Sequence, residues 1–406
     1  MKIKTSKMMD VAIILYFAVL TSFQIGYGID VIIKKATFVF LIFSFIIYCK
    51  RVNINKSTKQ LLFFWAFYFL SILWAKNKND VFMYFNNCIY ILIISVILSN
   101  RIRKKEDIIA ILKEIIISLF ITTIILFIRT PYADWGTIRI GEALGIHPNT
   151  LGVRMAFGSI LSLFFAHLSF KEKNNKKTIF YSFCILLFGM VSLFSQSKKS
   201  VLLLVVGISI FEIVSTKGFK VLLKTIVVIL MCALFINVLL NNNYLYGIIG
   251  YRINDFIASI NGVSSEVTGD ISTYERTFYI NNAITLFKRN IIFGYGGNNF
   301  ITYMREIGYS HVAYSHNNYT ELLCTLGIVG FFIYYLSWFK SLLNCRMIIS
   351  KYKEDILPCS LFLTIIACKL TADFALVSYM DEFINILFVC IVCYLDFYII
   401  KENKNE

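Results

Sequence analysis

Charged residues and prolines are scarce in this sequence: 16% of its 406 residues are Asp, Glu, Lys or Arg, and only three are proline. Hydrophobic residues make up 58% of the chain, and its mean hydropathy is +0.71. Apolar runs recur along the sequence, and each is long enough to cross hydrocarbon about 30 Å thick. The sequence therefore predicts a polytopic integral membrane protein.

Segments that alternate polar and apolar residues, as the strands of a membrane barrel do, are also lacking. Residues 108–128 and 221–240 are apolar on every face. This pattern suits a helix in lipid, because a helix satisfies its own backbone hydrogen bonds. We expect an all-α fold of about twelve membrane-spanning helices, near residues 11–29, 36–49, 61–75, 81–98, 108–128, 150–170, 179–195, 200–215, 221–240, 318–339, 356–376 and 381–399.

One long stretch, residues 241–317, is too polar to lie in a membrane. It divides the chain into a predicted 1–240 region with nine spans, a 241–317 extracytoplasmic loop, and a 318–406 region with three spans. Most lysines and arginines fall in alternate turns, which predicts that both termini are cytoplasmic and that the long loop lies outside the cytoplasmic membrane. Anionic lipid headgroups account for the net charge of +16, so nucleic acid is not expected as a partner.

Metal and disulfide chemistry have little support in the sequence. None of the ten cysteines lies in the long loop, and Cys390 and Cys393 form a C-x-x-C motif inside an apolar segment without a second pair or a nearby histidine. Packing is favoured over zinc or redox chemistry. No metal and no other cofactor is predicted. A cleavable signal peptide is not indicated, because the first apolar segment lacks a small-residue cleavage site.

Several polar residues converge on the predicted outer face. Arg139 and His147 lie between the fifth and sixth spans, and Lys198 and Lys199 lie in the tight turn 195–200. Two ammonium groups beside three serine hydroxyls and a helix N-terminus would suit a pyrophosphate. Snorkelling of long basic side chains at the interface is the alternative interpretation.

Within the long loop, residues 273–289 are predicted to form an amphipathic helix on the membrane surface. Arg276 falls in its predicted first turn, where the helix dipole disfavours a cation, so we expect an external anionic partner. The glycine turn at residues 293–297 is suited to bring the backbone close to a ligand.

His316 directly precedes the tenth predicted span, beside Asn317, Tyr319 and Glu321. One interpretation is a helix cap. The other is a general base, because an imidazole at the membrane interface with amide and carboxylate neighbours is suited to take a proton from an attacking hydroxyl. His147 has similar surroundings and ranks second.

The remaining polar residues receive structural interpretations. His167 and His311 are expected to have structural roles. Lys369 and Asp373 lie four residues apart in the eleventh predicted span, so they share one helical face and are expected to neutralise each other. A proton or ion path is the alternative for this pair.

Taken together, these motifs resemble the O-antigen polymerase (Wzy-type) and O-antigen ligase superfamily over residues 139–331. The resemblance is carried by their order: Arg139 with the run at 147–152, the Ser-x-Ser-Lys-Lys-Ser turn, Glu275-Arg276 followed by 292–296, and Ser-His-Asn-Asn-Tyr at 315–319 followed by Leu-Gly-Ile-Val-Gly at 326–330.

The resemblance implies a metal-independent glycosyltransferase of the cell envelope that acts on undecaprenyl-diphosphate-linked oligosaccharides at the outer face of the cytoplasmic membrane. It implies that His316 helps to activate the acceptor and that Arg139 and Arg276 hold the diphosphate. Lys198 stands where the family usually has arginine, and a lysine keeps the charge without the bidentate fork. The predicted substrate-binding set is completed by Lys199, Asn317, Tyr319 and His147. A chain-length regulator and a flippase are the protein partners that such a system implies.

Three functions follow from these patterns. The first is a polymerase that transfers a lipid-diphosphate-linked glycan onto a lipid-linked repeat unit, for capsule or O antigen. The second is ligase-type transfer of the glycan to another acceptor. The third, from another class, is a polysaccharide flippase or transporter. Scarce glycine and proline argue against the broken helices of a transporter, as does the single long outer loop.

Overall fold

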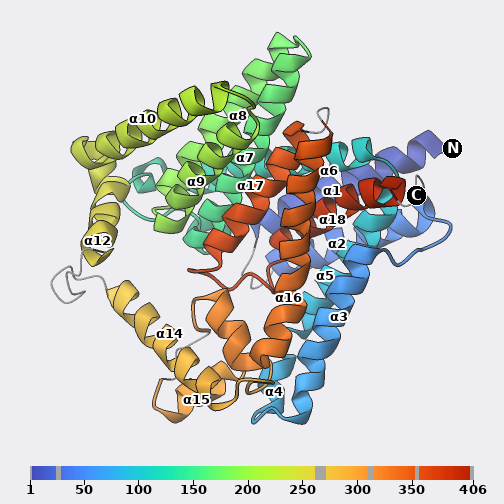
Figure 1. The fold of residues 1–406 in the computed structure, drawn as a ribbon, viewed down its shortest axis with the longest axis vertical. Coiled ribbons are helices and arrows are strands. Elements are labelled where there is room, and N and C mark those ends of the chain that lie inside the picture. Colours follow the sequence, from blue (N-terminus) through green and yellow to red (C-terminus); the bar gives the residue numbers. More distant parts are fainter. Residues whose placement is uncertain (1, 24–28, 261–270, 310–313, 353–355, 403–406) are drawn as a thin grey trace. The chain divides into compact units, whose positions relative to one another are not determined.

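The computed structural model describes residues 2–23, 29–260, 271–309, 314–352 and 356–402, and helices dominate these ranges (Figure 1). The predicted all-α fold class is therefore confirmed for this part of the chain. The chain forms two compact units. Unit 1 comprises residues 1–51, 106–262 and 348–368, and unit 2 comprises residues 52–105, 263–347 and 369–406.

Each predicted span coincides with helical structure. The helices concerned are α1 (Lys2–Ser22), α2 (Ile29–Tyr48), α3 (Lys56–Leu70), α4 (Lys78–Phe82) with α5 (Phe85–Arg101), α6 (Lys105–Arg129), α7 (Pro148–Lys171), α8 (Asn175–Phe194), α9 (Lys198–Val214), α10 (Lys220–Asn241), α16 (Asn318–Lys351), α17 (Ile356–Ala372) and α18 (Glu382–Glu402). Eight segments within the described ranges are long and apolar enough to cross a membrane. The chain is a polytopic membrane protein, and the number of twelve crossings stays a prediction.

Two predicted boundaries were wrong. The segment 29–35 was expected to be an outer turn, but α2 begins at Ile29 and includes Lys34 and Lys35. The tenth span was expected to end near residue 339, whereas α16 continues to Lys351. Hydropathy places the centre of a buried run well and its ends poorly, because a helix continues past the apolar stretch wherever its backbone hydrogen bonds are satisfied.

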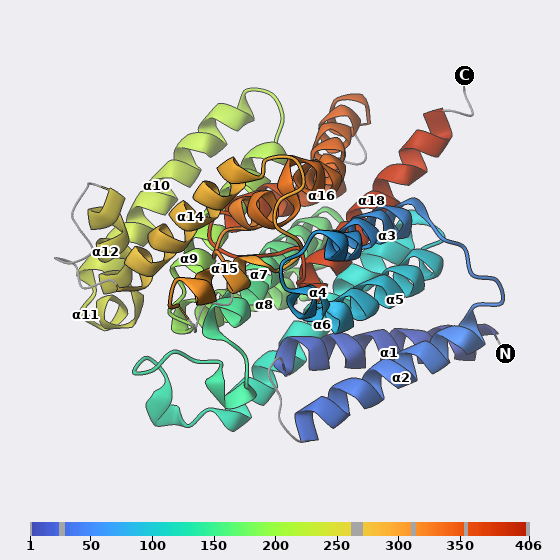
Figure 2. The ribbon, with the colours of Figure 1, turned by 90° about the horizontal axis from the view of Figure 1, so that it is seen from below.

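In unit 1, α7 is the central helix: 83% of its apolar span is buried, and it packs against α8 and α9 (Figure 1). Gly207 on α9 allows this close approach, since a Cβ atom there would lie 2.3 Å from the side chain of Ile160. By contrast, Leu239 is the buried residue of α10, and the rest of this helix is exposed or partly exposed, which suits a helix that faces lipid. Helices α1 and α2 run side by side in the same unit (Figure 2).

In unit 2, α18 packs against α5 and α3 (Figure 2). Aromatic rings fill much of the space between these helices and α16. Phe64 of α3 lies 5.0 Å from Tyr334 of α16 and 5.9 Å from Tyr379, measured between ring centroids. Such edge-to-face and tilted pairs add to the stability that burial of the rings provides.

The described residues of the polar stretch 241–317 are largely helical and are divided between the two units. Unit 1 holds α11 (Asn243–Leu245), a π-helical turn (Tyr246–Gly250) and α12 (Tyr251–Ile260). Unit 2 holds α14 (Ile271–Arg289) and α15 (Phe300–Glu306). The helix predicted at 273–289 is confirmed as α14, and its position on the membrane surface stays a prediction. Because α14 begins at Ile271, Arg276 lies beyond the first turn, and the argument from the helix dipole was wrong.

The apolar face of α14 packs on α15 and α16. Ala283 and Leu286 form a buried cluster with Phe300, Met304 and Cys324. The apolar face of α14 is therefore buried against protein.

Helix α16 is interrupted at Gly327, whose φ of 64° and ψ of −169° are not helical. Around this break, the loop after α14 forms hydrogen bonds with backbone groups of α16. The amides of Tyr295 and Gly296 donate to the carbonyls of Cys324 and Thr325 at 3.0 and 2.7 Å, and the amide of Ile328 donates to the carbonyl of Ile291 at 2.8 Å. Scarce glycine and proline therefore did not exclude a break in a helix of this protein. The glycine turn at 293–297 approaches the backbone of α16 at Gly294, and its approach to a ligand stays a prediction.

Candidate active site

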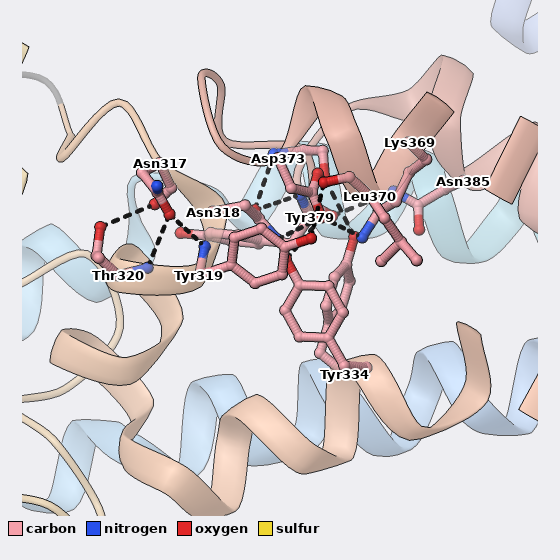
Figure 3. A network of polar contacts seen from close by, with 12 residues as sticks. Asn317, Asn318, Tyr319, Thr320, Tyr334, Lys369, Leu370, Asp373, Tyr379 and Asn385 are labelled. Atoms are coloured by element: carbon pink, nitrogen blue, oxygen red, sulfur yellow. Dashed lines mark hydrogen bonds and ion pairs between the residues drawn. The ribbon is translucent and has the colours of Figure 1, made fainter. Parts of the chain in front are cut away.

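His316 lies in a tight turn directly before α16, and its φ of 60° is in the left-handed region. Asn317 caps the helix: its side-chain oxygen accepts hydrogen bonds from the amides of Tyr319 and Thr320 at 2.9 and 3.1 Å (Figure 3). Its side-chain nitrogen donates to the carbonyl of Phe374 at 3.2 Å. A left-handed conformation is costly for a residue with a side chain, so the surrounding hydrogen bonds must hold it.

The next residues tie the start of α16 to the end of α17. The backbone N–H of Asn318 donates to the backbone carbonyl of Asp373 at 2.8 Å. The side-chain oxygen of Asn318 accepts from the backbone N–H of Ser378 at 2.9 Å. The Tyr319 hydroxyl donates to the carbonyl of Leu370 at 2.7 Å. Asn317 and Tyr319, predicted to bind substrate, therefore act within this framework through these bonds (Figure 3).

The predicted ion pair of Lys369 and Asp373 is confirmed, and it lies inside the same framework. The Lys369 ammonium is 2.5 Å from the Asp373 carboxylate, and both side chains are almost completely buried. The hydroxyls of Tyr335 and Ser378 donate to the carboxylate at 2.6 Å each. The ammonium also lies 4.4–4.7 Å from the ring centroids of Tyr334, Tyr335 and Trp338. Such a satisfied network holds the end of α17 rigidly against α16.

The His316 ring lies next to two tyrosine rings. Tyr279 of α14 is stacked on it at 5.9 Å between centroids, and Tyr314 is tilted against it at 4.5 Å. Arg276 precedes Tyr279 by three residues on α14, so both face the same side of that helix. Burial raises the pKa of the Tyr314 hydroxyl, while the nearby Arg276 guanidinium lowers that pKa. Unit 2 therefore brings Arg276 and His316 to one place, around Tyr314.

Glu321 is hydrogen-bonded to this turn. Its side chain is completely buried, and one carboxylate oxygen, Oε2, accepts the backbone N–H of Ser315 at 2.7 Å. The sequence predicted a carboxylate partner for the imidazole of His316. The contact that the structure gives is to the amide of the residue before it.

Unit 1 gathers a second group of predicted residues at the start of α7. The Arg139 guanidinium donates to the side-chain oxygen of Asn149 at 2.7 Å and to the carbonyl of Ser195 at 3.4 Å. His147 is exposed and caps α7, with its Nδ1 atom accepting the amide of Asn149 at 3.2 Å. The capping contact gives His147 a structural role.

The turn 195–200 presents Lys198 and Lys199 as the first two residues of α9, both half-buried. The predicted anion site at this turn stays a prediction, and two of its three serines have hydrogen bonds within the protein. Ser195 and Ser200 are buried, and both hydroxyls donate to the carbonyl of Ser192, at 2.7 and 3.2 Å. The hydroxyl protons of Ser195 and Ser200 are therefore donated to protein acceptors. An anion bound here would be held by the lysines and the helix amides.

Sequence reasoning missed Arg252. Its guanidinium reaches from α12 to the carbonyl of Gln196 at 2.7 Å, which adds a third basic side chain next to Lys198 and Lys199. The tertiary packing of α12, and no spacing in the sequence, brings this arginine to the turn.

The structure thus assembles Arg139, Lys198, Lys199 and His147 within unit 1, and Arg276, His316, Asn317 and Tyr319 within unit 2. That both groups act on one substrate stays a prediction. Of the histidines with expected structural roles, His167 bonds to Glu212 at 2.8 Å, which bears that role out. His311 lies outside the described residues. No group of three metal-ligating side chains is found in the ranges that the structure describes.

Residues 180–335 match the family model described as O-Antigen ligase (Wzy_C). This segment is an O-antigen ligase domain. The family transfers lipid-linked glycans, so the resemblance drawn from the motifs is confirmed at that level. The O-antigen ligase domain runs from α8 into α16 and includes Lys198, Arg276 and His316, whereas Arg139 and His147 precede it. No curated protein matches the chain.

Proposed function

We propose that the protein is an envelope polysaccharide polymerase. It transfers a glycan from its undecaprenyl diphosphate onto a lipid-linked repeat unit at the outer face of the cytoplasmic membrane, with both termini of the chain in the cytoplasm. The observation that carries this proposal is the placement of His316 in a held turn beside Arg276, inside an O-antigen ligase domain.

In the proposed reaction, an acceptor sugar hydroxyl attacks the anomeric carbon of the donor glycan. The new bond joins the acceptor oxygen to that carbon, and the bond between the carbon and the diphosphate oxygen breaks. His316 takes the hydroxyl proton as general base. Arg276 stabilises the negative charge that develops on the departing lipid diphosphate, a role suited to a planar fork of donors. Arg139, Lys198 and Lys199 of unit 1 are proposed to bind diphosphate through their positive charges.

The arrangement of unit 2 supports these proposed roles of His316 and Arg276. A general base must be fixed in place, and His316 is bounded by Asn317 and packed between Tyr279 and Tyr314. A glycosyl diphosphate already has a good leaving group, so the protein's main tasks are to position two sugars and to stabilise charge. Both tasks are within the reach of the side chains named here.

The test is a reconstituted reaction that contains the purified protein in lipid vesicles and only lipid-diphosphate repeat units. A polymerase produces a ladder of glycan lengths. A ligase produces nothing until another acceptor is added, and that outcome would replace polymerisation by ligase-type transfer.

The variant His316→Ala is expected to abolish the ladder while leaving the amount of protein in the membrane unchanged. His167→Gln is the control, because His167 bonds to Glu212 in unit 1, away from the His316 turn along the chain. A normal ladder from His316→Ala would remove this histidine from the reaction.

A further inference from the structure

Glu321 is a completely buried acidic residue that the proposed reaction does not use. It is the fourth residue of α16, where the positive end of the helix dipole favours a negative charge. Its Oε2 atom accepts the amide of Ser315. Burial of a polar carboxyl group costs free energy unless the group is hydrogen-bonded.

The bond to Ser315 fixes the residue directly before His316. The Ser315 hydroxyl donates to the carbonyl of Asn317 at 3.0 Å, so Ser315 is tied to the residue that follows His316 as well. His316 therefore lies between two residues whose positions are set by buried hydrogen bonds, and it adopts a φ of 60° between them. Without the carboxylate, the buried Ser315 amide would lose its acceptor and the turn could relax towards ordinary backbone angles.

The second oxygen, Oε1, has no hydrogen-bond partner among the residues that the structure describes. A negative charge on Glu321 would raise the pKa of the Tyr314 hydroxyl. Tyr314 is one of the two rings that flank His316. Glu321 therefore interacts with the Ser315 amide before His316 and electrostatically with Tyr314, whose ring contacts His316.

We propose that Glu321 is the positioning residue of the site: by accepting the Ser315 amide, it holds the left-handed turn that presents His316 to the acceptor sugar. The part that concerns glycan transfer rests on the proposed function. The part that concerns the turn does not.

The first experiment measures the turn directly in the full-length protein. Hydrogen exchange at the Ser315 amide is expected to be at least about tenfold faster in Glu321→Ala, because the amide loses its buried hydrogen bond. Glu321→Gln is expected to restore protection, since an amide oxygen can accept the same bond. Labelling of His316 by diethyl pyrocarbonate, read by mass spectrometry, should rise in the Ala variant and return towards normal in the Gln variant.

The second experiment measures transfer. In Glu321→Ala, kcat is expected to fall by about 100-fold, the scale of a small misplacement of a reacting group, while KM for the lipid-linked donor stays near the wild-type value. Glu321→Gln should recover most of kcat. The matched control is Glu382→Ala, which removes another buried first-turn carboxylate of the same unit, at the start of α18.

Three results would overturn the proposal. Unchanged Ser315 exchange and His316 labelling in Glu321→Ala would show that the turn does not depend on this residue. Faster exchange with an unchanged kcat would show that the turn does not set the rate. A Gln variant as inactive as the Ala variant would mean that the charge matters and the hydrogen bond does not.

If Glu321→Ala does not fold, Glu321→Asp replaces it, because the shorter side chain keeps the charge and cannot reach Ser315 in the same way. If the wild-type protein transfers no glycan, the proposed function fails, and exchange and labelling still decide whether Glu321 holds the turn.

Discussion

Arg276 and Tyr279 lie one helical turn apart on α14, and Tyr279 stacks on the His316 ring. This spacing places Arg276 and the aromatic partner of the proposed base on the same side of α14. This geometry is the residue-scale basis for assigning the departing diphosphate to Arg276, since a guanidinium can bind two phosphate oxygens at once.

We expect Arg276→Lys to lower kcat/KM by about 100-fold, in the range found when one donor to a developing charge is removed. The measurement is the initial rate of ladder formation over a range of donor concentrations. Arg289→Lys, at the exposed end of the same helix, is the control. Full activity in Arg276→Lys would mean that a simple positive charge is sufficient.

At the scale of elements, the break in α16 joins this helix to the loop that follows α14. A Cβ atom at Gly327 would lie 2.2 Å from the carbonyl oxygen of Ile292, so no larger residue fits without displacing that loop. Since α14 carries Arg276 and α16 begins after His316, the break connects the two elements that hold the proposed base and the proposed diphosphate ligand.

We expect Gly327→Ala to reduce both the melting temperature in detergent and the transfer rate, because the substitution adds a steric clash at a positive φ. Gly189→Ala on α8 is the matched control, since its Cβ atom would meet only the Ser159 hydroxyl at 3.9 Å. Equal melting temperatures for the two variants would contradict this account of the break.

The buried pair at the end of α17 gives a second prediction for this scale. Asp373→Asn is expected to destabilise the protein by about 3–5 kcal/mol, because it leaves the buried Lys369 ammonium without a counter-charge. The double variant Lys369→Met with Asp373→Asn should recover part of this loss, as seen in chemical or thermal unfolding. A double variant less stable than Asp373→Asn alone would show that the lysine contributes mainly through the surrounding aromatic rings.

For the whole molecule, the O-antigen ligase domain at 180–335 does not coincide with one compact unit: its first part belongs to unit 1 and its second part to unit 2. Basic side chains proposed to bind diphosphate occur in both, as Lys198 and Arg276. We therefore attribute neutralisation of the diphosphate to arginine and lysine side chains of this chain.

The corresponding prediction is that ladder formation by the reconstituted protein continues at an unchanged rate in excess EDTA. The rate is measured before and after chelation, and again after addition of Mg²⁺ or Mn²⁺. Loss of activity that a divalent ion restores would show that a metal takes part in binding or neutralising the diphosphate.

Local sequence determined the helices of this protein and several of its contacts. Each apolar run became a helix because lipid requires the backbone to satisfy itself. The spacing of polar and apolar residues predicted the helix α14. The four-residue spacing of Lys369 and Asp373 predicted their ion pair. The order of the motifs was sufficient to indicate the family.

Only the tertiary structure decided how these elements are joined. The sequence around Gly327 is apolar and looks like continuous helix, yet hydrogen bonds from residues 291–296 replace the broken turn. Asn317 and Tyr319 bond to the segment around the end of α17, and Glu321 bonds to the amide of Ser315. The physical reason is range: periodicity reports which residues share a helical face, whereas hydrogen bonds between distant segments exist only once those segments have folded together.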